Sequence, residues 1–256
     1  MDLSLDNKNF VVSGSNSGIG LAIAEALLVE KANVCLHGRN REKTQNIKKS
    51  LDEQFKANIS YFTADLSKHD AQVEVGKKMP TDFGPLDGIV CNAGSVFRNP
   101  ALTEQEQMLQ QIENNFFVAF NLINALLPFF SRRGGAIVLI SSIVSQIDIE
   151  GAPFGYSIGK QSLDRYAKIQ VKEMAKLGIR INVVSPGNIL FEGGAWDTKL
   201  KADKQAVQRR IKHDVPFKRF GSVEEIAYPT VFLLSEKSSF VSGANLVVDG
   251  GQSSQR

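Results

Sequence analysis

Short apolar runs alternate with longer stretches of helical periodicity along the whole chain. The runs are rich in β-branched residues, which is typical of strands covered on both faces. They predict seven strands, at residues 10–13, 33–37, 59–63, 88–91, 136–140, 181–184 and 245–248. The periodic stretches predict helices at residues 18–31, 41–57, 67–80, 103–132, 154–177 and 222–235. Because strand and helix alternate, we expect an α/β fold with a doubly wound parallel sheet and helices on both faces.

Residues 188–218 break this rhythm between the sixth strand and the last helix. We expect an irregular segment here, because it is too long for an ordinary connection, and long loops in compact domains often cover a binding site. Gly193 and Gly194 would serve as its hinge. The segment is therefore predicted to be a substrate lid, the alternative being an insertion without a role. No repeat or linker divides the chain, so one domain is expected over residues 1–256.

The composition is that of an ordinary globular protein and excludes several classes. Of 256 residues, 43% are hydrophobic and 22% charged, and a net charge of +3 does not argue for nucleic acid. No run approaches the ~18 apolar residues that span a bilayer, and the N-terminus lacks signal-peptide features. We expect a cytoplasmic protein without a membrane partner. Cys35 and Cys91 are expected to be buried free thiols, and the scattered histidines predict no metal site.

A glycine-rich turn follows the first predicted strand and opens the first helix. Its residues are Gly14, Ser15, Asn16, Ser17, Gly18, Ile19 and Gly20. Glycine lets the backbone approach a pyrophosphate closely, and the helix N-terminus offers N–H groups and the positive end of a dipole. The spacing is G-x-x-x-G-x-G, and its place in a β-α-β series indicates a dinucleotide-binding turn.

With further motifs, the chain resembles the short-chain dehydrogenase/reductase family over nearly its whole length. The matching residues are Asp65, Leu66, Asn92, Ala93, Gly94, Asn115, Ser142, Tyr156, Lys160, Pro186, Gly187 and Val248 to Gly251. The resemblance implies a Rossmann-like, single-domain, seven-stranded fold that binds NAD(P)(H).

The resemblance also assigns places to the cofactor-binding residues. It implies that Asp65 contacts the adenine and that the stretch Asn92, Ala93 and Gly94 packs under the adenosine and ribose. It adds Leu66, Pro186, Gly187 and Ile189 to the cofactor site, with backbone near Ile189 holding the carboxamide. Taken singly, Asp65 could instead cap a helix starting near Ser67, and residues 92–94 could be only a turn.

The residue type at the end of the second strand indicates whether a protein of this fold prefers NAD or NADP. An acidic residue there would bind the ribose 2′-hydroxyl, whereas an arginine accommodates a 2′-phosphate. This chain has no carboxylate there and places Arg39 after Gly38, which favours NADP(H), with NAD(H) as the alternative. Arg39 could also be a solvated charge or stack on the adenine of NAD. Ser17 occupies the turn position at which some NADP-dependent family members carry a basic residue.

The spacing of Tyr156 and Lys160 places both on one face of a helix, one turn apart. A free tyrosine has a pKa of about 10, and two nearby cations, Lys160 and an oxidised nicotinamide, would have to lower it by about 3 units, or roughly 4 kcal/mol. Tyr156 is then the general acid/base, and Lys160 tunes it and reaches the nicotinamide ribose. Ser142, with Ser141 as its rival, hydrogen-bonds the substrate oxygen.

By resemblance, Asn115 would hold a water near the lysine for proton relay. Its neighbour Asn114 is a rival for that position, and an amide that braces a helix bend is the structural alternative. Phe191 departs from the family pattern, which usually has a threonine that bonds the nicotinamide carboxamide. Together with Ile189, Leu190 and Trp196, Phe191 could form an apolar substrate wall or ordinary packing.

We therefore predict hydride transfer between NADP(H) and a ketone or secondary alcohol. The alternatives are a 3-oxoacyl-acyl-carrier-protein reductase and a regulatory protein that binds a dinucleotide without turnover; the chain is too short for a nucleotide-sugar epimerase's second domain. Residues 199–219 carry eight basic side chains against Asp203 and Asp214, which predicts an anionic substrate or else a solvated amphipathic helix.

Family resemblance also implies a homotetramer or dimer. The stretch 103–132 supports it with apolar residues in excess of what one sheet face needs. These residues are Phe116, Phe117, Phe120, Leu122, Leu126, Phe129 and Phe130.

Overall fold

Seven parallel strands form one sheet in a computed structural model of the chain, which describes residues 2–96 and 99–255. The strands are β1 (Asn9–Ser13), β2 (Asn33–Gly38), β3 (Ile59–Thr63), β4 (Gly88–Cys91), β5 (Gly135–Ile140), β6 (Ile179–Pro186) and β7 (Asn245–Val248). Their order is β3-β2-β1-β4-β5-β6-β7. All seven predicted strands are present, with boundaries that shift by no more than two residues. The predicted fold class is confirmed.

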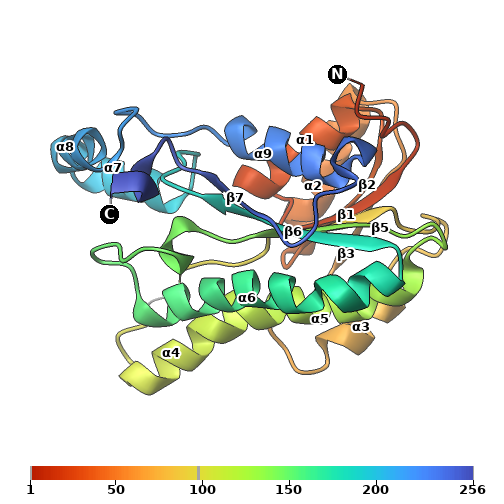
Figure 1. Cartoon of the computed structure of the whole chain (residues 1–256), viewed down its shortest axis with the longest axis horizontal. Coiled ribbons are helices and arrows are strands. Elements are labelled where there is room, and N and C mark those ends of the chain that lie inside the picture. The colour runs from red at the N-terminus through yellow and green to blue at the C-terminus, as the bar shows by residue number, and fades with distance from the viewer. Residues whose placement is uncertain (1, 97–98, 256) are drawn as a thin grey trace.

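Helices cover both faces of the sheet (Figure 1). One layer holds α1 (Gly18–Val29), α2 (Arg41–Gln54) and α9 (Glu224–Leu234). The opposite layer holds α3 (Ala71–Lys78), α4 (Glu104–Ile112), α5 (Val118–Leu126) and α6 (Phe154–Lys176). The strand order reverses between β1 and β4, so the connections leave these two neighbours toward opposite sides. Such a point is where open α/β sheets bind ligands.

Successive residues of the central strands pack into two separate cores. In β1, Val11 belongs to the core under α5 and α6, whereas Phe10 and Val12 belong to the core under α1 and α9. All three side chains are fully buried. Because both sheet faces are covered, the strands are apolar on both sides rather than alternating with polar residues. Burial of each such side chain contributes about 1.5–3 kcal/mol to the stability of the fold. This packing keeps the strands, and therefore their ends, in place.

The prediction of one helix over 103–132 is wrong. After α4, a π-helix (Glu113–Phe117) interrupts the segment before α5, and a short 3₁₀ helix (Leu127–Phe129) ends it. A π turn inserts one extra residue relative to α geometry, and such turns are frequent at functional sites. Here it carries Asn115, which is completely buried. Hydrophobic periodicity does not reveal a single inserted residue.

Residues 188–218 are not irregular, since they form two helices, α7 (Ala195–Ala202) and α8 (Lys204–Asp214). Asp203 separates them and caps α8, its carboxylate accepting a hydrogen bond from the Ala206 N–H at 2.9 Å. The helices share a small core of Val207, Ile211 and Val215. The segment is therefore a folded unit and not a loose loop.

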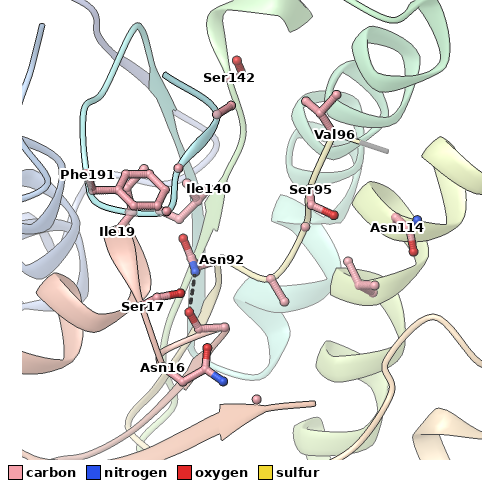
Figure 2. A pocket seen from close by; sticks show the side chains of 18 of the residues that line it. Asn16, Ser17, Ile19, Asn92, Ser95, Val96, Asn114, Ile140, Ser142 and Phe191 are labelled. Carbon is pink, nitrogen blue, oxygen red and sulfur yellow. Dashed lines mark hydrogen bonds between the residues drawn. The ribbon is translucent and has the colours of Figure 1, made fainter. Parts of the chain in front are cut away.

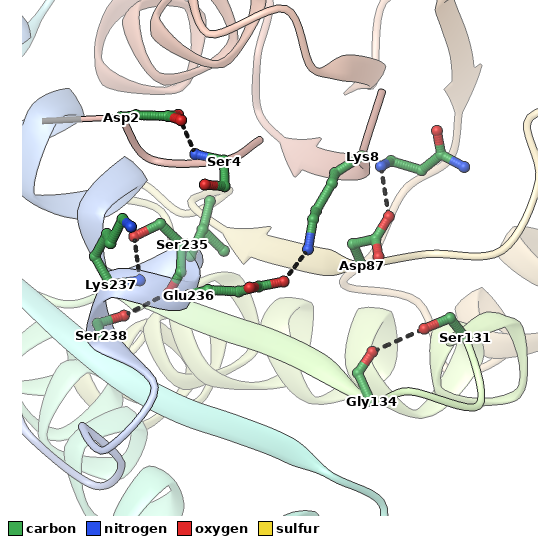
Figure 3. Close-up of polar contacts among 12 residues, drawn as sticks. Asp2, Ser4, Lys8, Asp87, Ser131, Gly134, Ser235, Glu236, Lys237 and Ser238 are labelled. Carbon is green, nitrogen blue, oxygen red and sulfur yellow. Dashed lines mark hydrogen bonds and ion pairs between the residues drawn. The ribbon is translucent and has the colours of Figure 1, made fainter. Parts of the chain in front are cut away.

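Polar contacts hold the amino-terminal edge of the sheet (Figure 3). Lys8, just before β1, forms an ion pair with Glu236 at 2.5 Å. The Asp87 carboxylate accepts from the backbone N–H of Asn9 at 2.9 Å. Before β5, the Ser131 hydroxyl donates to the Gly134 carbonyl at 3.1 Å. These contacts fix the strand starts and leave the opposite, carboxyl edge for a binding site.

Candidate active site

A cleft of about 760 Å³ opens at the carboxyl ends of β1, β2, β4, β5 and β6 (Figure 2). Its volume lies within the usual range for ligand and cofactor sites. The predicted residues that line it are Gly14, Asn16, Ser17, Ile19, Arg39, Asp65, Leu66, Asn92, Ala93, Gly94, Ser142, Tyr156, Lys160, Pro186, Gly187 and Ile189. Four further predicted residues are absent from the lining, namely Ser15, Gly18, Gly20 and Asn115.

The glycine turn is held against β4 by a network around Ser13. The Ser13 hydroxyl oxygen accepts from the backbone N–H groups of Asn92 and Ala93, each at 3.0 Å. The Asn92 amide donates back to the Ser13 carbonyl at 3.0 Å. Gly20 is required for this approach, because a Cβ there would lie 2.3 Å from the Gly14 carbonyl oxygen. The turn can therefore approach a ligand without a side chain between them.

His37 lies directly behind the turn and was not among the predicted site residues. Its Nδ1 accepts from the Gly14 N–H at 3.4 Å, so Nε2 carries the proton and donates to the Ala64 carbonyl at 3.1 Å. Burial lowers the pKa of His37 to about 4. The ring is therefore neutral at physiological pH and keeps both bonds. The buried Ser15 hydroxyl accepts from the His37 N–H at 2.9 Å, which explains why Ser15 supports the cleft without lining it.

The end of β2 brings Arg39 and Lys43 to one end of the cleft. Both line it, and Lys43 lies in the first turn of α2. Asp65 lines the same end, after β3. Burial raises the pKa of Asp65, but hydrogen bonds from Ser67 and the charge of Arg39 together hold it below its usual value. Asp65 accepts from the Ser67 hydroxyl at 2.7 Å, and α3 starts only at Ala71, so Asp65 does not cap that helix.

The two serines after β5 have different partners. The Ser141 hydroxyl is buried and donates to the Lys160 carbonyl at 3.2 Å, so it supports α6. Ser142 caps a short 3₁₀ helix (Ile143–Ser145), and its hydroxyl acts on Tyr156 by lowering the pKa of the phenol. Both line the cleft, but only Ser142 acts on the pKa of Tyr156.

Tyr156 and Lys160 lie one turn apart on α6, at the centre of the cleft. Lys160 is only 4% exposed, and its ammonium donates to the Ile140 carbonyl at 2.8 Å. It lies 5.9 Å from the centre of the Tyr156 ring. Burial lowers the pKa of Lys160 to about 8 and raises that of Tyr156, against the opposing hydrogen bond with Ser142. In the protein alone, the tyrosine is therefore a neutral acid; the lowered pKa expected from the sequence also requires the charge of an oxidised nicotinamide and stays a prediction.

Asn115 lies behind Gly94 and close to Lys160. Its amide nitrogen donates to the carbonyls of Ser95 at 3.0 Å and Gln111 at 2.9 Å, while Oδ1 has no hydrogen-bond partner. A Cβ on Gly94 would lie 2.9 Å from that oxygen and 3.4 Å from the Lys160 ammonium. Glycine therefore preserves the space between Asn115 and Lys160. Asn114, its sequence rival, lines the cleft itself (Figure 2).

The other end of the cleft is lined largely by apolar and uncharged side chains. Phe191 lies against the glycine turn, because a Cβ on Gly18 would be 2.6 Å from its ring (Figure 2). Val96, Trp196 and Thr198 also line this region. Phe191 and Trp196 thus line this wall of the cleft, whereas Leu190 is 37% exposed and does not line it; a substrate contact there stays a prediction.

The basic side chains of residues 199–219 lie outside this wall. None of the eight is part of the described cleft lining. Lys201 pairs with Asp197, Arg210 with Asp214 and Arg219 with Glu225. Any effect of this charge on a ligand would therefore act over distance and not by contact with a ligand inside the cleft.

Comparison with known proteins identifies the family. A family model described as enoyl-(acyl carrier protein) reductase matches residues 14–253. The chain belongs to the short-chain dehydrogenase/reductase family. It is 32% identical to a 3-oxoacyl-acyl-carrier-protein reductase of Chlamydia muridarum, over 98% of this chain and 99% of the relative. It is also 32% identical to gluconate 5-dehydrogenase of Gluconobacter oxydans, over 97% and 95%.

Solved structures agree with this family. L-Sorbose reductase from Gluconobacter frateurii, solved with NADPH and L-sorbose, superimposes with a TM-score of 0.90 at 31% identity, covering 98% of both chains. The chain is accordingly an oxidoreductase that transfers hydride between a nicotinamide dinucleotide and a carbonyl or alcohol group. In the described part of the chain, no helix is long and apolar enough to cross a membrane. Nor do those residues contain a cluster of three or more side chains suited to a metal ion.

Replacing Gly20 tests the tight glycine turn. In Gly20→Ala, the new methyl group would meet the Gly14 carbonyl and the Asn92 amide, so the turn must move. We expect the dissociation constant for NADPH, measured by fluorescence titration, to rise by at least about tenfold, equivalent to about 1.4 kcal/mol. Gly76→Ala on α3 is the matched control, because its methyl group would meet nothing within 4 Å. Unchanged binding in Gly20→Ala would contradict the steric argument.

Proposed function

We propose that the protein is an NADP(H)-dependent reductase of a ketone or aldehyde, reversible in principle, with Tyr156 as its proton donor. The observation that carries the proposal is the convergence of Ser142, Tyr156 and Lys160 in one cleft beside the glycine turn. The short-chain dehydrogenase relatives that match nearly the whole length of the chain support this proposal. A protein that bound the dinucleotide without turnover would have no need of a buried lysine next to a neutral tyrosine.

The protein's residues supply proton transfer and orientation. When bound, NADPH would supply the hydride. A carbonyl oxygen that gains negative charge would receive a hydrogen bond from Ser142 and the phenolic proton of Tyr156. Because burial raises the pKa of Tyr156, this proton is present at neutral pH, which favours the reductive direction.

Lys160 and Asn115 would return a proton to the tyrosine. The Lys160 ammonium has three donors, one of which binds the Ile140 carbonyl, leaving the others for a ribose hydroxyl and a relay. The Asn115 oxygen near it is a suitable acceptor for a bridging water. In this proposal, Asn115 acts by holding the relay and does not touch the substrate.

Cofactor preference is assigned to the basic end of the cleft. The proposed ligand of the 2′-phosphate is Arg39, joined by Lys43, which the sequence did not single out. Asp65 would lie at the adenine. Structural relatives solved with the phosphorylated cofactor include L-sorbose reductase with NADPH and an Agrobacterium tumefaciens reductase with NADP, and this supports the same preference here.

Arg39→Ala tests this preference. A charge-assisted phosphate bond contributes roughly 1.5–3 kcal/mol, so the ratio of NADH to NADPH dissociation constants should fall by at least about tenfold. Fluorescence titration of both cofactors measures the ratio. Arg41→Ala, an exposed arginine at the start of α2, is the control and should keep the wild-type ratio. Equal affinities in the wild type, or no change in Arg39→Ala, would contradict the assignment.

The substrate is a small carbonyl compound or alcohol that enters beneath the segment 188–218, which we propose as a lid. A second candidate, 3-oxoacyl-acyl-carrier-protein reduction, is favoured by the similarity to the Chlamydia relative. The surplus of basic residues on α7 and α8 supports an anionic substrate attracted over distance. Two buried free thiols suit a reducing compartment such as the cytoplasm.

A panel assay tests the activity and the role of Tyr156 together. NADPH oxidation would be followed with ketoses, an anionic and a neutral ketone of similar size, a 3-oxoacyl thioester and a 2-enoyl thioester. On any accepted carbonyl, Tyr156→Phe should lower kcat by at least about 10²-fold with NADPH binding nearly unchanged. Tyr228→Phe removes an exposed hydroxyl on α9 and serves as the control. If Tyr156→Phe stayed within about threefold of the wild type, the tyrosine would not be the general acid.

We also propose a homotetramer, or a dimer as its half. Of the seven apolar residues singled out in 103–132, Leu122 and Leu126 are fully buried, and Phe116, Phe129 and Phe130 pack partly buried against the core. Exposed apolar side chains on this side include Leu109, Phe117, Phe154 and Ile169, from α4, the π-helix and α6.

Light scattering during size-exclusion chromatography tests this assembly. We expect a mass of two or four chains for the wild type and a smaller assembly for Phe154→Glu combined with Ile169→Glu, because a buried charge without a partner disfavours the interface. Val29→Glu places the same charge on an exposed apolar site of α1, in the opposite layer, and should not change the mass. A monomeric wild type would rule out the proposed assembly.

A further inference from the structure

Asp164 continues the row of functional residues on α6. It follows Lys160 by one helical turn, as Lys160 follows Tyr156, so the three side chains lie along one face. Unlike the other two, Asp164 does not line the cleft. It packs instead against the turn that carries Ser142.

One Asp164 oxygen joins three elements of the fold. Oδ2 lies 2.6 Å from the Ser145 hydroxyl and accepts from the Asn245 amide, at the start of β7, at 2.8 Å. The Ser145 hydroxyl also lies 2.7 Å from the Ser142 carbonyl oxygen. Asn245 in turn accepts from the Ser185 hydroxyl of β6 at 2.8 Å. Asp164 therefore connects the helix of Tyr156 to the backbone of Ser142.

The number of protons in this chain of contacts is informative. Ser145 makes two short oxygen–oxygen contacts, and each needs one proton between the atoms. A serine hydroxyl has one proton, and the carbonyl of Ser142 has none to give. If Ser145 donates to Ser142, the second proton must come from the Asp164 carboxyl group. If Asp164 is ionised, the single Ser145 proton has to be shared between Asp164 Oδ2 and the Ser142 carbonyl in a three-centre bond, whereas a neutral Asp164 gives each contact a proton of its own.

The electrostatic surroundings agree with this state. Burial raises the pKa of Asp164, and this outweighs the neighbouring hydroxyls, the Lys160 ammonium and the Asn245 amide, which lower it. Lys160, on the same helix, is the charged group that acts on it. The side chains that contact Asp164 from the Ser142 turn and from β7, Ser145 and Asn245, are uncharged.

We propose that Asp164 is a positioning residue for the reaction: as a neutral carboxylic acid it donates to Ser145, which donates to the Ser142 carbonyl and fixes the serine that binds the substrate oxygen. This role rests on the proposed function of Ser142 and Tyr156. It adds a residue that touches neither substrate nor cofactor but sets the distance between α6 and the Ser142 turn.

Kinetics of three variants test the positioning role on a carbonyl compound that the wild type reduces. Asp164→Ala and Ser145→Ala should each lower kcat by about tenfold to 10²-fold, with the NADPH dissociation constant unchanged, because a displaced catalytic group costs rate more than binding. The double variant should be no slower than the slower single variant, since both break one chain. Asp164→Asn keeps a donor toward Ser145 but loses the oxygen that accepts from the Asn245 amide, so its kcat should lie between those of the wild type and Asp164→Ala.

The pH profile tests the neutral state. An amide and a neutral acid carry the same charge, so Asp164→Asn should leave the pH dependence of kcat/KM unchanged. Glu173→Gln makes the same acid-to-amide change on the exposed surface of α6 and serves as the control. A shifted profile in Asp164→Asn alone would show that Asp164 is ionised and would overturn the proposal, as would wild-type kcat in Asp164→Ala or Ser145→Ala.

An infrared measurement decides the protonation state without any substrate. The difference spectrum between wild type and Asp164→Asn at neutral pH should contain the carbonyl band of a protonated carboxyl group. Its absence would overturn the inference even if the enzyme is active. Conversely, a wild-type protein that reduces no carbonyl compound would refute the proposed function, while the infrared band would still report on Asp164.

Discussion

Parallel pairing of the strands is the constraint on which the site depends. Parallel strands must be buried on both faces, and their carboxyl ends must all emerge at one edge. Where the order reverses between β1 and β4, the helices that follow leave in opposite directions and a crevice opens. The glycine turn after β1, Asn92 after β4 and Ser142 after β5 reach that crevice for this reason. The ends of the strands, rather than their interiors, carry the chemistry.

Much of this arrangement could be predicted from the sequence, and the reason is physical. The strands could be predicted because their apolar, β-branched runs reflect burial on both faces of the sheet. Each run shows this composition without reference to the rest of the chain. The spacing of Tyr156 and Lys160 was informative because one turn of helix fixes their relation before any tertiary contact is known. The glycine turn was recognisable because only glycine tolerates the approach of Gly20 to the Gly14 carbonyl.

What the sequence missed depends on contacts between distant segments. Nothing local marks Glu113–Phe117 as a π-helix, since its periodicity continues that of the flanking helices. The helices α7 and α8 pack mainly on their own small core, so their apolar pattern is too sparse to stand out. His37 and Asp164 act through partners in other strands and loops, and a lone histidine or aspartate carries no signal of that kind. For Asp164, a weak signal existed, because it follows Lys160 by the same four residues that separate Lys160 from Tyr156.

Two groups of residues can thus be distinguished by what they contact. Arg39, Ser142 and Tyr156 present polar atoms to the cleft, whereas Ser13, His37 and Asp164 bond the backbone or side chains that hold the first group. Removing a side chain of the first group removes an interaction with a ligand or with the transition state. Removing a side chain of the second group leaves every reacting group present but misplaced, and reaction rates are more sensitive to such displacement than binding is.

The buried Lys160 belongs to both groups, because its single ammonium bonds the Ile140 carbonyl and lies beside the Tyr156 ring. Lys160 therefore joins α6 to the end of β5 beside the tyrosine.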